Sequence, residues 1–257
     1  MSCKNRLKSL SGTAKALLLA VTLIFPLGVA APALAGSATW QSSNIQYLYG
    51  SGYELDPHTH SVITVEHADG WKYGDNFFFL DVINGEQQTD DHNTSLYSEF
   101  SPRLSLGKIS GKDLSFGPVK DVLLAGTLEM GQGFHNYLYG LGVDLAIPKF
   151  AFFQLNAYVR DNPSQSGVTY QFTPCWALPF NAGPVKMLFE GFADIAGSEG
   201  DLAFNIDTQP RLLVDLGNFW GAPDSVYAGT EVQIWHNKYG VSGVNEFVPQ
   251  AMVKWVF

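Results

Sequence analysis

The fold class is decided by the last eleven residues, FVPQAMVKWVF, which run from Phe247 to Phe257. One alternate row is apolar throughout and consists of Phe247, Pro249, Ala251, Val253, Trp255 and Phe257. The other row is mixed and, counted from the preceding residue, consists of Glu246, Val248, Gln250, Met252, Lys254 and Val256. Successive side chains of a strand point to opposite faces, and a membrane-barrel strand turns one row to lipid and the other to the lumen. The pattern predicts such a strand. The alternative is the edge strand of a soluble β-sandwich, because half-buried strands also alternate.

The first 35 residues have the features of a secretory signal peptide. A basic segment precedes an apolar run from Ala16 to Ala35, and the run ends in the small-x-small pattern Ala33-Leu34-Ala35. The alternative is a membrane-anchoring helix, which Pro26 and Pro32 disfavour because proline interrupts a helix. We therefore expect residues 1–35 to be removed and residues 36–257 to form the mature domain.

The composition of the expected mature chain argues against a nucleic-acid partner. Loss of the four basic residues of the signal takes the formal net charge from −9 to −13, whereas binding to nucleic acid requires a basic stripe. Cys175 is then the single cysteine, so no intrachain disulfide is expected. No apolar run of membrane-helix length follows Ala35. An exported chain with 14% aromatic and 15% charged residues is then expected to be a soluble periplasmic β protein or an outer-membrane barrel.

Short alternating segments, separated by clusters of Gly, Pro, Asn and Asp, predict twelve strands. They cover residues 44–50, 61–69, 75–83, 95–107, 119–130, 135–147, 150–161, 167–179, 184–196, 204–216, 225–237 and 246–257. An even number of strands closes an antiparallel barrel with both termini on one side, which is expected to be periplasmic. The tightest connection is expected at Pro148-Lys149, and the polar stretch 84–94 is expected to be an external loop.

Four stretches carry a resemblance to a known family. They are YSEFSPRLSL at 97–106, GKDLSFGPVK at 111–120, YLYGLGVDL at 137–145 and AYVR at 157–160. Together they resemble the nucleoside-specific outer-membrane channel family, the Tsx/OmpK group. Trp255 and the closing Phe257 also resemble the C-terminal insertion signal of Gram-negative outer-membrane proteins.

The resemblance implies a monomeric twelve-stranded barrel in the cell outer membrane, with a narrow lumen that admits nucleosides and deoxynucleosides. The partners that it implies are nucleosides, outer-membrane lipids, the barrel-assembly machinery, and bacteriophages or toxins that use the barrel as a receptor. No cofactor or metal is expected.

Aromatic and charged side chains on the expected inward rows are the candidate lumen site. They are Tyr97, Glu99, Arg103, Glu129, Asp144, Tyr158, Arg160, Glu190, Arg211, Glu231 and Lys254. A nucleoside offers a flat base and sugar hydroxyls, which call for aromatic faces and for polar groups in the same site. The alternative is that opposed charges pair across the lumen and only brace the barrel.

Three other functions compete with a nucleoside channel. They are a non-selective small porin, a phage or adhesin receptor with a closed lumen, and an outer-membrane lipid hydrolase. An enzyme needs an activated nucleophile with a base in reach. No serine stands in a recognisable nucleophile context beside His135 or His236, so no catalytic residue is expected.

Overall fold

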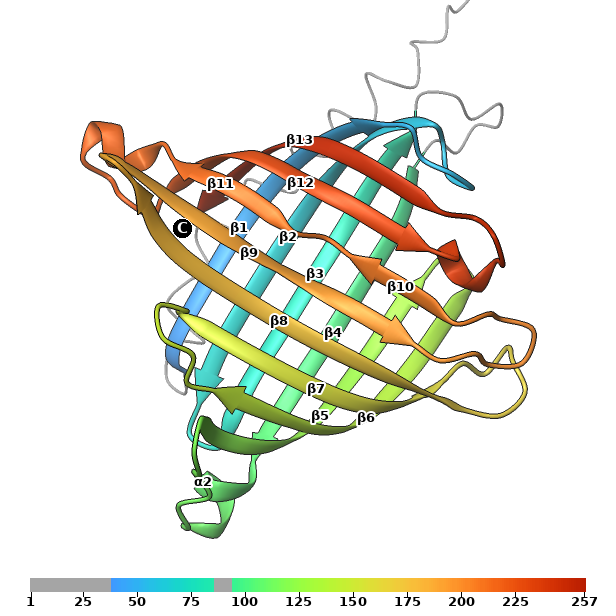
Figure 1. The fold of residues 1–257 in the computed structure, drawn as a ribbon, viewed down its shortest axis with the longest axis horizontal. Helices are drawn as coiled ribbons and strands as arrows, with labels where there is room; N and C mark the ends of the chain where they lie inside the picture. The colour runs from blue at the N-terminus through green and yellow to red at the C-terminus, as the bar shows by residue number, and fades with distance from the viewer. Residues whose placement is uncertain (1–37, 86–93) are drawn as a thin grey trace, which may run out of the picture. The chain divides into compact units, whose positions relative to one another are not determined.

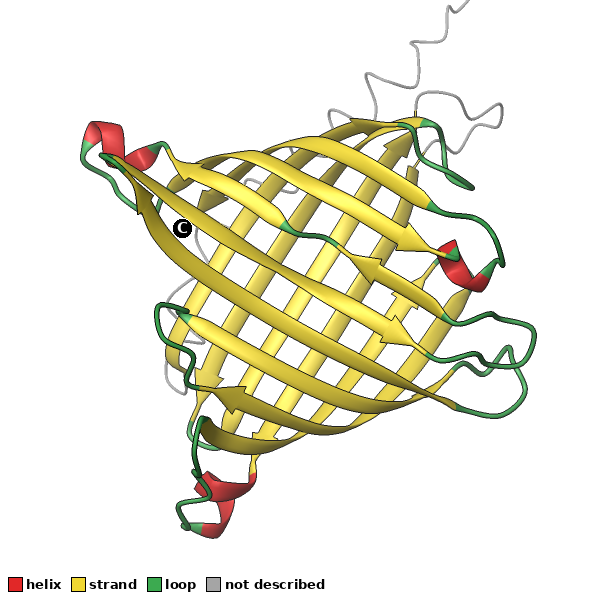
Figure 2. Ribbon diagram, viewed as in Figure 1, coloured by secondary structure: helices red, strands yellow, loops and turns green. Residues whose placement is uncertain are grey.

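A computed structural model describes residues 38–85 and 94–257. The expected signal peptide and most of the expected loop 84–94 lie outside these residues. Almost all of the described chain is strand, with short helices only in the connections (Figure 2). The strands are β1 (Ala38–Ser51), β2 (Thr59–Trp71), β3 (Gly74–Gly85), β4 (Thr94–Ser105), β5 (Val119–Gly131), β6 (Phe134–Leu145), β7 (Phe152–Asp161), β8 (Thr169–Ala182), β9 (Val185–Ala196), β10 (Asn205–Thr208), β11 (Arg211–Asp215), β12 (Val226–His236) and β13 (Glu246–Val256). The helical segments are α2 (Leu106–Ser110), η1 (Gly217–Trp220) and η2 (Lys238–Gly240).

The strands form a closed antiparallel barrel (Figure 1). Strands that are neighbours in the sequence pair with each other, except β10 and β11. Strand β1 pairs with β13 to close the sheet, with Tyr47 opposite Val253. Both β10 and β11 lie between β9 and β12. They are therefore two halves of one strand, and the prediction of a twelve-stranded barrel is confirmed.

The break between β10 and β11 falls at Gln209-Pro210, within a single expected segment. Proline has no N–H to donate to the sheet. The neighbouring strand accommodates the irregularity with Gly191, where a Cβ would lie 2.7 Å from the backbone oxygen of Gln209. The close approach explains why the chain has glycine there.

The barrel has two ends, which we name by their connections. The turn end holds the start of β1, the end of β13 and the connections 72–73, 106–118, 146–151, 183–184 and 216–225. The loop end holds the connections 52–58, 132–133, 162–168, 197–204 and 237–245. The expectation that Pro148-Lys149 is the tightest connection is wrong, because residues 146–151 all lie outside the strands. Two-residue turns instead occur at 72–73, 132–133 and 183–184, and Gly133 and Gly183 supply the positive φ that such turns favour.

One short helix, α2, was not expected. The Ser105 hydroxyl oxygen accepts a hydrogen bond from the Lys108 N–H, and Gly111 ends the helix in the left-handed conformation. Five residues are too few for a helical period to show in the sequence. Among residues 38–85 and 94–257, no helix is long and apolar enough to cross a bilayer.

Burial alternates along the strands as the sequence pattern predicts. In β13, Phe247 is 66% exposed, whereas Val248 is fully buried and Gln250 is 2% exposed. Exposed apolar side chains therefore cover the outer face of the barrel, and polar groups together with some apolar ones fill the inner face. This arrangement suits a barrel in lipid.

Candidate functional site

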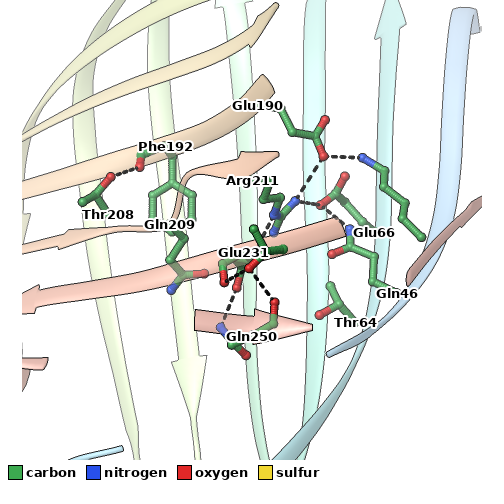
Figure 3. A network of polar contacts seen from close by, with 12 residues as sticks. Gln46, Thr64, Glu66, Glu190, Phe192, Thr208, Gln209, Arg211, Glu231 and Gln250 are labelled. Atoms are coloured by element: carbon green, nitrogen blue, oxygen red, sulfur yellow. Dashed lines mark hydrogen bonds and ion pairs between the residues drawn. The ribbon is translucent and has the colours of Figure 1, made fainter. Parts of the chain in front are cut away.

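A network of charged side chains crosses the lumen around Arg211 of β11 (Figure 3). The Arg211 Nε donates to Glu231 Oε2 at 2.6 Å. Its Nη1 lies 3.5 Å from Glu66 Oε2 and 3.7 Å from Glu190 Oε1. Glu190 and Glu231 are on the strands next to β11, but Glu66 is on β2, beyond β12, β13 and β1. The Arg211–Glu66 contact therefore joins separate parts of the inner wall across the lumen.

The carboxylates around Arg211 have further partners. The Lys254 Nζ donates to Glu190 Oε1 at 2.7 Å, and the Gln250 Nε2 donates to Glu231 Oε1 at 2.9 Å. The side-chain amides of Asn44 and Gln46 donate to Glu66 at 2.9 and 3.1 Å. A buried charge is costly unless it is paired and hydrogen-bonded, and this network satisfies both conditions.

A second cluster lies on the inner wall of β3, β4 and β6. The Arg103 guanidinium holds Asp75 with two hydrogen bonds, at 2.8 and 2.7 Å, and donates to Asp144 at 2.9 Å. Arg103 is only 4% exposed. The fork geometry is the one in which arginine binds a carboxylate most strongly.

A third cluster lies on β5 to β9. Arg160 donates to both oxygens of Glu129 and to Gln171 Oε1. Gln171 and Thr173 donate in turn to Asp194, at 2.9 and 2.6 Å. No lysine or arginine nitrogen of the described chain lies within 4.0 Å of the Asp194 carboxylate, so its neighbours there are neutral donors.

Aromatic side chains stand beside the clusters on the inner wall. The Tyr97 hydroxyl donates to Glu99 Oε1 at 2.5 Å, and the Tyr97 ring lies 5.7 Å from the Phe79 ring. Tyr158 is 7% exposed and packs with Ala125 and Leu138. Glu99 forms no salt bridge within the described residues.

The structure brings the candidate residues into four groups and one isolated position. Glu190, Arg211, Glu231 and Lys254 share the first cluster, Arg103 and Asp144 the second, Glu129 and Arg160 the third, and Tyr97 contacts Glu99. Tyr158 contacts none of the others through a hydrogen bond in the described chain.

Several residues of the inner wall were missed. Glu66 and Asp75 belong to the clusters above, and the inward row of β2, which also carries Thr64, was the signal that could have found Glu66. An apolar cluster of Leu48, Leu213, Tyr227 and Met252 also faces inward, and Met252 belongs to the mixed inner row that the sequence pattern predicts for β13.

Unpartnered polar atoms mark another part of the inner wall. Asp207 of β10 and Trp235 of β12 are paired neighbours in the sheet. Within the described chain, Asp207 Oδ1 and Trp235 Nε1 are both buried and have no hydrogen-bond partner. Two neighbouring residues of this wall therefore carry a buried acceptor and a buried donor without partners in the described chain.

Comparisons with known proteins identify a family and relatives with similar sequences. A family model described as nucleoside-specific channel-forming protein, Tsx, matches residues 35–247. The outer membrane protein OmpK of Vibrio parahaemolyticus is 26% identical over 229 residues, which cover 80% of this chain and 81% of that protein. A second OmpK sequence from the same species is 27% identical over 136 residues, covering 48% of this chain and 50% of that protein.

Among solved structures, the KdgM porin in complex with disordered oligogalacturonate gives a TM-score of 0.47 at 12% identity, covering 83% of this chain and 99% of that one. The family model matches most of the chain, and this match shows that the protein belongs to the family of Tsx nucleoside-specific channel-forming proteins.

Proposed function

We propose that the protein is an outer-membrane channel for the passive uptake of nucleosides and deoxynucleosides, and that it acts as a monomer with both termini in the periplasm. The observation that carries the proposal is the pair of unpartnered polar atoms on Asp207 and Trp235, beside an inner wall whose arginines and lysines are already bound to carboxylates. Such a wall suits a neutral solute that brings its own donor and acceptor.

The chemistry of a nucleoside matches this pair. Paired side chains on neighbouring strands have Cβ atoms about 5 Å apart, so one nucleobase edge or one sugar diol would contact both residues once the side chains that cover the two atoms move aside. Asp207 Oδ1 would accept from an N–H or O–H of the solute, and Trp235 Nε1 would donate to a solute oxygen or ring nitrogen. The indole ring also offers a face on which a base can stack. A channel must release its solute, so the affinity is expected to be modest.

The proposal is tested by current block in planar bilayers. Thymidine or adenosine should reduce the single-channel current at millimolar concentration, and glucose should reduce it far less. Trp235→Phe keeps an aromatic ring and removes the donor, and it should weaken the nucleoside block by about 0.5–1.5 kcal/mol. Asp207→Asn should weaken the block in the same range.

The matched control is Trp176→Phe. Trp176 lies between the inward residues Cys175 and Ala177 on β8, so its side chain is on the outer face. Its replacement should leave the block unchanged. Equal block by nucleosides and glucose would support a non-selective small porin instead, and the absence of conductance steps would support a receptor barrel with a closed lumen.

A further inference from the structure

A fully buried lysine joins two connections at the loop end. Lys238 lies in the 237–245 connection between β12 and β13 and is 0% exposed. Its Nζ is 2.6 Å from Asp56 Oδ2 in the 52–58 connection and 2.7 Å from Glu246 Oε2 at the start of β13. The Tyr239 hydroxyl donates to the same Asp56 oxygen at 2.8 Å. Two loops far apart in the sequence are therefore tied by one ammonium group.

The residues on both sides of Lys238 have a strained backbone. Asn237 and Tyr239 have φ values of 51° and 55°, in the left-handed region that residues other than glycine rarely adopt. Such strain persists only where surrounding contacts hold it. Burial and the charge of Asp56 raise the pKa of Tyr239, so its phenol stays protonated and continues to donate.

The tied loop carries an aromatic side chain into the barrel. Tyr53 is 3% exposed, its ring stacks on His60 with 3.6 Å between centroids, and its hydroxyl donates to Gln250 Oε1 at 2.7 Å. Gly50 makes room for it, because a Cβ at Gly50 would lie 2.5 Å from the Tyr53 hydroxyl oxygen. The backbone N–H of Glu54 donates to the same Glu246 oxygen that binds Lys238.

The contacts continue from this loop to the centre of the lumen. Gln250 accepts from Tyr53 and donates to Glu231, and Glu231 binds Arg211 (Figure 3 shows the last two contacts). Tyr53 is therefore attached both to the loop tie and to the network that crosses the lumen.

We propose that Lys238 is a positioning residue of the pore: by tying the 52–58 and 237–245 connections together, it holds Tyr53 inside the loop end and so narrows the path of a solute. The inference rests on the channel function but not on the preference for nucleosides. Removal of the tie frees the 52–58 connection, withdraws the Tyr53 ring from Gln250 and widens the entrance.

The experiment compares Lys238→Met with Glu199→Met, a variant that removes a contact between two other loops at the same end. Glu199 is 4% exposed and accepts a hydrogen bond from the backbone N–H of Asn162, so it links the 197–204 and 162–168 connections without contacting Tyr53. Both Lys238→Met and Glu199→Met lose a buried polar contact at the same end of the barrel. Folding is checked first by seminative gel electrophoresis, on which an intact barrel resists unfolding at room temperature.

We expect folded Lys238→Met to conduct about twofold more than the wild type in salt alone, and Glu199→Met to conduct as the wild type does. Tyr53→Ala should reproduce the rise with Lys238 in place. Unchanged conductance of folded Lys238→Met, or an equal rise in Glu199→Met, would overturn the proposal.

If Lys238→Met does not fold, Asp56→Ala removes the tie but leaves Lys238 paired with Glu246, and it should show the same rise in conductance. A further measurement restores the tie covalently. Cysteines replace Asp56 and Lys238 in a Cys175→Ser background, and a short bifunctional thiol reagent bridges them. The bridged barrel should conduct as the wild type does, and the same barrel treated with a monofunctional reagent should conduct more. Equal conductance of the two preparations would contradict the role of the tie. Because no nucleoside is present, failure here is separate from failure of the nucleoside proposal.

Discussion

Two sectors of the inner wall use the same residue types in different ways. In the sector of β9, β11, β12, β13, β1 and β2, which we call the bridged sector, Arg211 reaches Glu66 past three intervening strands. In the sector of β3 to β8, which we call the lining sector, Arg103 reaches Asp144 and Arg160 reaches Glu129 past a single strand. The bridged contacts brace the barrel across its width, whereas the lining contacts follow the wall.

The two sectors also differ in what surrounds the charges. The apolar cluster of Leu48, Leu213, Tyr227 and Met252 belongs to the bridged sector, and Leu213 is fully buried there. The lining sector instead holds Tyr97 and Tyr158, together with the Glu99 carboxylate, which has no salt bridge within the described chain. We therefore expect the Arg211 network of the bridged sector to govern stability. Glu99 and the aromatic rings of the lining sector, together with the Asp207–Trp235 pair, are expected to act on the solutes and ions that pass.

The largest effect should follow loss of the arginine at the centre of the bridged sector. Arg211→Met leaves Glu66, Glu190 and Glu231 close together without their shared cation, and removal of one partner from a buried ion pair costs about 3–5 kcal/mol. Arg160→Met in the lining sector removes the cation of a single carboxylate, Glu129, and should cost less. Urea unfolding of both variants in detergent measures the difference.

The control for this comparison is Arg211→Lys, which keeps the charge and should recover part of the stability. It should not recover all, because an ammonium cannot reproduce the planar fork of a guanidinium. Equal losses in the free energy of unfolding of Arg211→Met and Arg160→Met would show that a contact across the lumen stabilises the barrel no more than a contact along the wall.

The sequence was sufficient to predict the barrel because lipid imposes a strict period of two. Every outward side chain of β13 has to be apolar, so the pattern from Phe247 to Phe257 is visible without knowledge of its neighbours. Predicted strand boundaries were less accurate where a strand continues past its lipid-facing part. The first strand begins at Ala38 rather than at residue 44, since polar residues such as Gln41 and Ser42 carry no apolar period.

The partners of the inward residues could not be predicted in the same way. Alternation placed Arg211 and Glu231 on the inner face, but contacts such as Arg211–Glu66 depend on the tilt and stagger of a closed barrel. The contact of Lys238 with Asp56 is harder still to predict from the sequence. It joins two loops through a strained backbone, and loop residues show no periodic pattern. Both the Arg211–Glu66 and the Lys238–Asp56 contacts depend on how the whole barrel closes.

A smaller effect is expected from the aromatic residues of the two sectors. Tyr158→Leu in the lining sector should weaken nucleoside block by about 1–3 kcal/mol if the ring stacks a base, which is the range for bases on aromatic platforms. Tyr227→Leu in the bridged sector removes a ring that packs against Leu213 and a hydroxyl that donates to Asp224. It should lower stability and leave the block unchanged. The reverse result would make Tyr227, and not Tyr158, the ring on which a base stacks.

The smallest effect separates selectivity from stability at single carboxylates. Glu99→Gln in the lining sector removes a negative charge that has no salt bridge within the described chain, while the Tyr97 hydroxyl keeps an acceptor. Its cation-over-anion permeability ratio, read from the reversal potential in a salt gradient, should fall by about twofold with no loss of stability. Glu231→Gln in the bridged sector should lower both the ratio and the stability, because Arg211 loses its shortest contact. If Glu99→Gln destabilised the barrel as much as Glu231→Gln, Glu99 would be a structural element, and the separation of bracing from ion passage at these two carboxylates would fail.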